Sequence, residues 1–148
     1  IPVLRKDFIA NVYQIVEARA HGADLVLLIM AGLADEEVAR LLEITHSWGM
    51  EALVETHSED ELVRAVTLGA RIIGVNARDL TTFELDQELF GRLQHLIPEG
   101  ALKVAESAVV NSQDVTRYRE QGAHAVLVGE ALVTGVTPEH TVKEFVEA

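Results

Sequence analysis

Groups that can take part in chemistry or bind an anion follow six short apolar runs of the sequence, at the point where each run ends. An unpaired charge inside a buried strand is costly to desolvate, so such groups belong at strand ends. Parallel strands that carry polar groups at the same end predict one shared site at one rim of a sheet. The polar candidates are Lys6, Glu55, Asn76, Arg78, Glu106, Ser107 and Glu130, and Ala31-Gly32 and Gly129 offer backbone amides.

Lys6 and Glu55 are the candidate acid and base. A partly desolvated lysine at a barrel rim serves as a general acid or forms a Schiff base. A carboxylate withdrawn from bulk water is expected to have its pKa raised toward the range of a general base. The alternatives are a surface charge for Lys6 and, for Glu55, a partner of the next helix dipole. We expect His57 to be structural or solvated rather than catalytic.

The remaining rim residues favour anion binding. Arg78 offers a planar fork for a carboxylate or a phosphate, and Asn76 offers both a donor and an acceptor. A turn built on asparagine and aspartate is the alternative for this segment. If the last two strands are the final ones of a β/α barrel, Ser107 and Gly129 lie where backbone amides commonly bind phosphate.

Strand-like and helix-like segments alternate along the chain, which predicts six βα units in a single α/β domain over residues 1–148. Continuous apolar runs are typical of parallel strands covered on both faces. Two architectures fit: an open doubly wound sheet, or part of a (β/α)8 TIM barrel, which closes with eight units. The sequence contains neither Gly-x-Gly-x-x-Gly nor a Gly-Lys-Ser/Thr loop. The expected helices cover residues 11–21, 35–49, 58–69, 86–98, 112–121 and 139–146.

Local signals set the limits of these segments. Asp35 and Asp86 are candidate N-caps, and Ser58 with Glu61 has the spacing of a capping box. Three joints repeat a helix-ending glycine, an alanine and a polar residue before an apolar strand. They are residues 22–24, 69–71 and 122–124.

Composition narrows the class of partner. The chain has 24 acidic and 12 basic residues, which argues against a nucleic-acid partner and leaves room for a local basic site. It has no cysteine, and no His/Asp/Glu cluster has convincing metal-ligand spacing. No apolar stretch approaches the roughly 20 residues of a membrane span, so we expect a cytoplasmic protein.

These segments resemble indole-3-glycerol-phosphate synthase, a barrel enzyme of tryptophan biosynthesis. The resemblance covers the whole chain, in order, and is most specific in PVLRKDF and VNARDL. By this match, the first strand here corresponds to the third strand of the family barrel and the last to its eighth. The matching stretches are Pro2–Phe8, Ala23–Ile29, Gly49–His57, Ile73–Leu80, Ala105–Ser107 and Ala125–Glu130.

The resemblance implies a cofactor-independent reaction. The family converts 1-(2-carboxyphenylamino)-1-deoxyribulose 5-phosphate into indole-3-glycerol phosphate by ring closure, decarboxylation and dehydration. By this match, Lys6 is similar to the family's general acid, Glu55 to its general base, and Asn76 to a group that supports dehydration. The other positions so implied are Arg78 and Glu106 as substrate contacts, Phe8 and Leu127 as apolar walls, and Ser107, Ala108, Gly129 and Glu130 at the phosphate.

Two departures from the family pattern lead to expectations. The family usually has glycine where this chain has Ala108, so we expect weaker phosphate binding. The family's first two strands, which carry a catalytic glutamate and a substrate-binding lysine, have no counterpart, so we expect the chain alone to be inactive. The chain opens on Ile1 and looks like a piece of a longer protein, with open sheet edges that could pair with another copy.

Two other functions remain alternatives. A phosphoribosylanthranilate isomerase is a second phosphate-binding barrel, but its acid-base pair would be cysteine and aspartate, and cysteine is lacking. A non-catalytic partial barrel that folds or assembles through its edges is the alternative from a different class.

Overall fold

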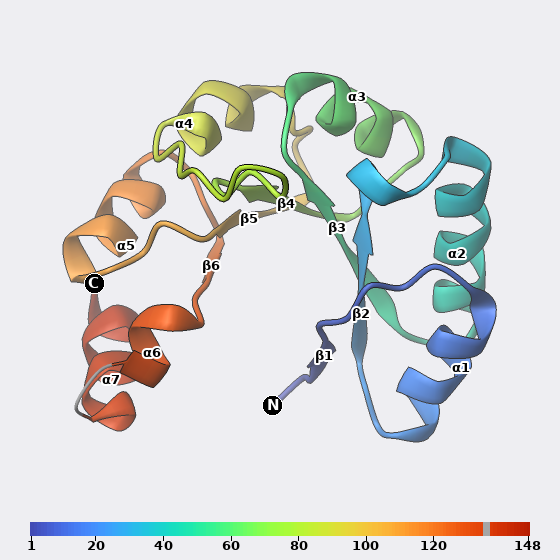
Figure 1. Ribbon diagram of the computed structural model, residues 1–148, viewed down its shortest axis with the longest axis horizontal. Helices are drawn as coiled ribbons and strands as arrows, with labels where there is room; N and C mark the ends of the chain where they lie inside the picture. The colour runs from blue at the N-terminus through green and yellow to red at the C-terminus, as the bar shows by residue number, and fades with distance from the viewer. Residues whose placement is uncertain (135–136) are drawn as a thin grey trace.

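The computed structural model describes residues 1–134 and 137–148 and contains one six-stranded parallel sheet (Figure 1). The strands follow one another in sequence order across the sheet, with no reversal. Each neighbouring pair is parallel, so all six carboxyl ends meet at one rim. The strands are β1 (Leu4–Arg5), β2 (Leu25–Ile29), β3 (Glu51–Thr56), β4 (Ile72–Asn76), β5 (Leu102–Glu106) and β6 (Ala125–Leu127).

The helices lie around the outside of a curled sheet, as Figure 1 shows for α1 to α5. A doubly wound sheet would carry helices on both faces and reverse its strand order. Neither feature is present in the described residues, so the fold is a partial (β/α)8 barrel. The helical segments are α1 (Val12–Ala20), η1 (Met30–Gly32), α2 (Asp35–Ser47), α3 (Glu59–Thr67), α4 (Leu89–Leu93), η2 (Gln94–Leu96), α5 (Ser112–Glu120), α6 (Glu130–Thr134) and α7 (Pro138–Glu147).

Short polar side chains begin three of the helices. The side chains of Asn11, Ser58 and Asn111 each accept a hydrogen bond from a backbone N–H of the first helical turn. The glycines that end α1, α3 and α5 have positive φ, as the repeated joint predicts. They are Gly22 at 87°, Gly69 at 78° and Gly122 at 94°.

Two expectations about helix starts are wrong. Asp35 is the first residue of α2 rather than its N-cap, which is Ala34, and its carboxylate instead pairs with Arg64 at 2.7 Å. Helix α4 begins after Glu88. Asp86 therefore precedes the helix, where it pairs with Arg92 at 2.6 Å. In both cases the carboxylate forms an ion pair with an arginine later in the chain instead of capping the helix.

Helix α6, five residues long, was not expected from the sequence. It begins directly at the last rim position, after β6 and Gly129. Its residues contain no helix-spaced apolar face that is buried, which is why periodicity did not reveal it.

The sheet has a large apolar layer outside and a small one inside. The outer layer packs strand residues such as Val26, Val54 and Ile73 against the helices. The inner layer consists of Leu27, Ile29, Leu53 and Val104, with Leu4, Ile72 and Leu127 packed against it. This inner layer forms an apolar floor below the carboxyl-terminal rim.

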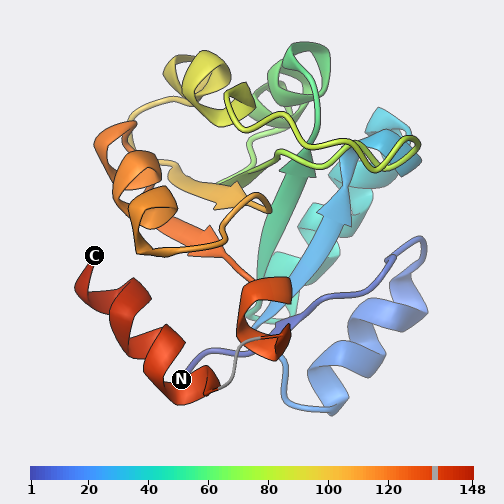
Figure 2. The same cartoon turned by 60° about the vertical axis from the view of Figure 1, so that its left-hand side comes forward.

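The two outermost strands each have one neighbour within the described residues. Strand β1 pairs only with β2, and β6 only with β5, so the curled sheet ends at two free edges (Figure 2). Free edges of this kind are protected in natural proteins by further strands or by another covering segment.

Gly74 leaves the space on β4 that the Glu106 carboxyl group occupies. A Cβ atom at this position would overlap Glu106 Oε1 and would lie 3.2 Å from Leu53 Cδ1. An alanine would displace the Glu106 carboxyl group from its present position, and Leu53, which is 3% exposed, would have to shift as well. A glycine is therefore required here by packing rather than by its backbone angles.

We predict that Gly74→Ala lowers the free energy of unfolding by about 1–3 kcal/mol, the usual range for overpacking. Chemical denaturation followed by circular dichroism measures it. Gly32→Ala is the matched control, because no atom lies within 4 Å of a Cβ placed there. An equal effect of the two substitutions would contradict this account of Gly74.

Candidate active site

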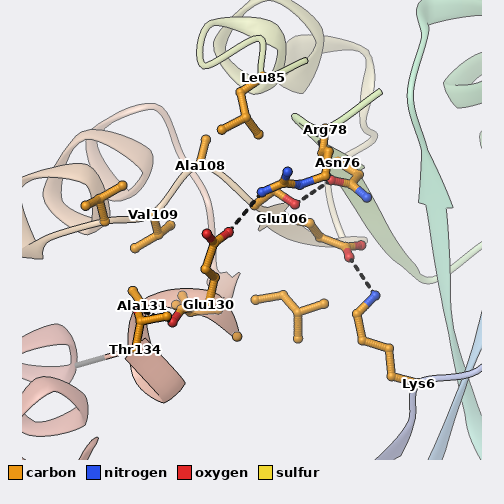
Figure 3. A pocket seen from close by; sticks show the side chains of 15 residues that line it. Lys6, Asn76, Arg78, Leu85, Glu106, Ala108, Val109, Glu130, Ala131 and Thr134 are labelled. Atoms are coloured by element: carbon orange, nitrogen blue, oxygen red, sulfur yellow. Dashed lines mark hydrogen bonds and ion pairs between the residues drawn. The ribbon is translucent and has the colours of Figure 1, made fainter. Parts of the chain in front are cut away.

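A pocket of about 670 Å³ opens at the carboxyl ends of β4, β5 and β6 (Figure 3). Lys6 reaches it from beyond the end of β1, and its ammonium group points toward Glu106. The lining residues are Lys6, Asn76, Arg78, Leu85, Glu106, Ser107, Ala108, Val109, Val110, Leu127, Val128, Gly129, Glu130, Ala131 and Thr134.

Two buried glutamates meet one lysine at the base of this pocket. Lys6 Nζ lies 3.5 Å from Glu55 Oε2 and 3.8 Å from Glu106 Oε2. Both glutamate side chains are 2% exposed, whereas Lys6 is 50% exposed. Lys6 can therefore reach both the carboxyl groups and a molecule bound in the pocket.

The two carboxyl groups have opposite pKa shifts. Burial, together with the charge of Glu55, raises the pKa of Glu106 to about 8. Burial also raises the pKa of Glu55, but hydrogen bonds from His57, Asn76 and Glu106 and the charge of Lys6 outweigh it. The pKa of Glu55 is therefore lowered, and the expectation that it is raised is wrong. The sequence argument considered desolvation alone and not these donors.

At neutral pH Glu106 consequently holds a proton. Neither of its oxygens is hydrogen-bonded to a donor within residues 1–134 and 137–148. A protonated Glu106 is itself a donor and can share its proton with the carboxylate of Glu55, whose charge raises the pKa of Glu106. The pair is thus one carboxylic acid and one carboxylate, as expected for two acidic groups that are too close for both to ionise.

Asn76 joins three neighbouring strand ends. Its Nδ2 donates to Glu55 Oε1 at 3.0 Å. Its Oδ1 accepts from Ser107 Oγ at 2.7 Å and from the backbone N–H of Arg78 at 3.1 Å. These bonds fix the orientation of the amide and link β3 and β4 to the loop after β5. Asn76 therefore stabilises the turn after β4 and also lines the pocket, whereas the sequence offered a turn role and a binding role as alternatives.

His57 belongs to the same cluster, although we expected it to be structural or solvated. Its Nε2 lies 3.1 Å from Glu55 Oε1, and its Nδ1 lies 3.2 Å from Glu61 Oε2. Burial lowers the pKa of His57, but the two glutamates outweigh it and raise the value to about 9. His57 follows the last residue of β3, and residues two apart in an extended segment share a face, so the spacing of Glu55 and His57 could have indicated this contact.

The opposite side of the pocket carries an exposed ion pair and two unusual backbone positions. Arg78 Nη2 lies 3.1 Å from Glu130 Oε2, as Figure 3 shows. Ser107 and Ala108 both have positive φ, at 66° and 55°. Such angles are uncommon for residues other than glycine and favour a functional or strained turn.

The structure brings nine of the eleven residues proposed from the sequence to the pocket surface. Glu55 lies directly behind that surface, against Lys6 and Asn76. Phe8 is 74% exposed and does not line the pocket, so its role as an apolar wall stays a prediction. The nine are Lys6, Asn76, Arg78, Glu106, Ser107, Ala108, Leu127, Gly129 and Glu130.

Several lining residues were not foreseen from the sequence. Leu85 arrives through an isolated antiparallel bridge with Arg78, and Val109 and Val110 follow the turn at Ala108. No periodic signal marks such loop positions. In the described part of the chain, no group of three or more histidine, cysteine, aspartate or glutamate residues could hold a metal ion. No described helix is long and apolar enough to cross a membrane.

Comparison with known proteins identifies the family. The family model for indole-3-glycerol phosphate synthase matches residues 1–145. The chain belongs to the indole-3-glycerol phosphate synthase family. Curated indole-3-glycerol phosphate synthases include relatives from Parafrankia sp. (strain EAN1pec), 55% identical over 148 residues, and from Leifsonia xyli subsp. xyli, 57% identical over 145 residues.

The chain spans about half the length of these synthases. The Parafrankia match covers 100% of this chain and 55% of the relative, and the Leifsonia match covers 98% and 55%. The matched region is the C-terminal part of these proteins. Their remaining length is therefore not represented in the six βα units described above.

Solved structures of other enzymes share the fold. The 3-hexulose-6-phosphate synthase of Salmonella typhimurium superposes with a TM-score of 0.79 at 16% identity, covering 99% of this chain and 72% of that one. A chain of the tryptophan synthase complex of Pyrococcus furiosus gives 0.75 at 16% identity, covering 99% and 67%. At this identity the likeness extends to the barrel architecture alone.

The raised pKa of Glu106 makes stability depend on pH. In the unfolded chain Glu106 ionises near its ordinary pKa of 4.5, and in the folded protein near 8. Its contribution to stability is therefore complete below pH 4.5 and is lost as the pH rises toward 8. Glu106→Gln keeps a neutral side chain that can donate to Glu55.

We predict that the stability of Glu106→Gln relative to wild type increases by about 1 kcal/mol or more between pH 5 and pH 8, since one pKa unit corresponds to 1.36 kcal/mol. Urea unfolding at both pH values measures it. The matched control is the exposed Glu99→Gln. If the difference in the free energy of unfolding between Glu106→Gln and wild type does not change with pH, Glu106 is not protonated in the folded protein.

Ala108 has a left-handed backbone angle that glycine adopts without strain. We predict that Ala108→Gly raises the free energy of unfolding by about 0.5 kcal/mol, because relief of the angle exceeds the added chain entropy.

Binding of inorganic phosphate to Ala108→Gly, measured by calorimetry, should tighten, because the methyl group leaves the pocket surface. Ala31→Gly, at an exposed position outside the pocket, should give neither gain. Unchanged phosphate affinity in Ala108→Gly would refute the predicted weakening by this methyl group.

Proposed function

We propose that the protein containing this chain is an indole-3-glycerol phosphate synthase and that these six βα units supply most of its active site. The observation that carries the proposal is Lys6 between Glu55 and Glu106 at the base of the pocket. Membership of the family supports the same assignment. The proposed reaction closes the pyrrole ring of the substrate, releases carbon dioxide and eliminates water.

We propose that Lys6 is the general acid and Glu55 the general base. Lys6 lines the pocket and carries a proton that can pass to the departing ketone oxygen. Glu55 is ionised at neutral pH and can accept a proton at Oε2 once substrate displaces Lys6 from that oxygen, while Asn76 and His57 stay on Oε1. Asn76, which donates to Glu55, would hold that carboxylate in place during dehydration.

The remaining rim residues are proposed to hold the substrate. Arg78 and Glu106 would contact its polar groups, and Leu127 would contact its aromatic ring. Backbone amides near Ser107, Ala108, Gly129 and Glu130 would bind the phosphate, which anchors the substrate without taking part in bond breaking. All of these residues line one pocket, which supports a single binding mode.

The 148-residue chain alone is proposed to be inactive. Its sheet has two free edges, and the family's first two strands would add a glutamate and a lysine to the same rim. The free edges also favour self-association, because an unpaired edge strand can pair with a strand of another copy. The same edges could instead pair with the family's first two strands. Cytoplasmic location stays a prediction, as does the absence of a cofactor.

Reconstitution of a whole barrel tests this function. The N-terminal segment of the Leifsonia xyli synthase that precedes the matched region is fused to this chain, and indole-3-glycerol phosphate formation is followed by fluorescence. We expect turnover from the fusion and none from the 148-residue chain. In the fusion, Lys6→Met and Glu55→Gln should each lower kcat by about a hundredfold or more, the usual contribution of acid-base groups.

The matched control in the fusion is Glu59→Gln, which removes an exposed carboxylate close to the site in sequence but outside the pocket. Full activity of the Lys6 and Glu55 variants would exclude their proposed roles. Turnover by the chain alone would show that the two further strands are not needed.

A further inference from the structure

One buried ion pair is not explained by contact with substrate. His57 does not line the pocket, yet its ring lies between the proposed base and a second glutamate. We propose that His57 and Glu61 form a positioning relay that orients Glu55 and keeps it ionised. This inference rests on the proposed function only in taking Glu55 as the base.

Three contacts fix the ring of His57. Glu61 Oε2 lies 3.2 Å from Nδ1 and also accepts the backbone N–H of His57 at 2.8 Å. The other ring nitrogen, Nε2, forms an ion pair with Glu55 Oε1 at 3.1 Å. The side chain of His57 is 11% exposed, and that of Glu61 is 18% exposed.

Glu61 is itself held at the start of α3. Its backbone N–H donates to Ser58 Oγ at 3.3 Å, which is one half of the expected capping box. In the other half, the glutamate side chain would return to the backbone N–H of Ser58. Glu61 instead turns to His57. The departure from the usual box therefore places a carboxylate behind the imidazole ring.

The charges around His57 come from four elements. Glu55 on β3 and Glu61 on α3 are in contact with it. Glu106 on β5 and Asp79 in the loop after β4 also sense its charge. The carboxylates of Glu55, Glu61 and Asp79 favour the imidazolium form, whereas Glu106 adds no charge while it holds its proton. The positive charges of Lys6, next to Glu55, and Arg64, next to Glu61, disfavour the imidazolium form.

This relay determines which of the two buried glutamates holds the proton. Asn76 donates a hydrogen bond to Oε1 of Glu55, and His57 Nε2 forms an ion pair with the same oxygen at 3.1 Å, whereas neither oxygen of Glu106 has a hydrogen-bond donor in the described residues. The asymmetry favours charge on Glu55 and a proton on Glu106. A neutral side chain at position 57 removes the charge that maintains this difference while leaving the pocket surface intact.

NMR of the 148-residue chain tests the relay without requiring turnover. The imidazole signals of His57, assigned by their loss in His57→Gln, should titrate near pH 9. In Glu61→Gln the midpoint should fall by at least one pH unit, whereas in Glu59→Gln it should not move. Glutamine at position 61 still accepts the backbone N–H of His57, so α3 keeps its first turn.

Carboxyl ¹³C signals complete the measurement. The pKa of Glu55 should rise by about one unit or more in His57→Gln, as expected on loss of a close opposite charge. A His57 midpoint near the ordinary value of 6.5 overturns the proposal. An unchanged Glu55 pKa in His57→Gln overturns it too, because His57 would then act through packing alone.

Kinetics of the reconstituted barrel separate positioning from binding. In His57→Gln we expect kcat to fall about tenfold with little change in KM, and the acidic limb of the pH profile to move to higher pH. A fall confined to KM contradicts the relay. If the fusion shows no turnover while the NMR results hold, the relay stands and the proposed reaction fails.

Discussion

The whole site depends on the burial of two carboxyl groups that cannot both be charged. Glu55 on β3 and Glu106 on β5 lie at strand ends on either side of β4 with almost no exposure to water, where an unpaired charge is very costly. One keeps its proton, and the other is compensated by Lys6 and His57. The buried groups therefore carry nearly balanced charge, although the chain as a whole has a formal charge of −12.

Barrel packing makes this arrangement possible. The apolar floor below the rim, which includes Leu53 and Val104, excludes water from beneath the carboxyl groups. On β4, Gly74 contributes no side chain where its neighbours require space. The low local dielectric strengthens each remaining charge interaction. For the same reason, a buried charge that loses its partner destabilises the fold strongly. Electrostatics and side-chain volume thus constrain the same few positions.

The sequence predicted where the site residues lie better than it predicted which of them are ionised. Apolar runs identified all six strands, and their ends indicated Glu55, Asn76 and Glu106, because parallel strands must finish at a common rim. The pKa of Glu55 was assigned the wrong direction, since the sequence argument left out the neighbouring His57 and could not foresee the contacts with Asn76 and Lys6. Helix α6 was missed because it is only five residues long and has no buried residues to give a helical periodicity.

The two sides of the pocket differ in how easily substrate can displace their contacts. The ion pair of Arg78 and Glu130 is exposed, with side chains 34% and 77% accessible, and such pairs contribute only about 0–1 kcal/mol. An incoming anion can replace Glu130 at little cost. The contacts of Glu55 are buried and cannot be exchanged for water, so they remain in place before substrate arrives. Under the proposed function, the pocket would combine an adaptable side that binds an anion with a preorganised side that transfers protons, as catalysis by differential stabilisation requires.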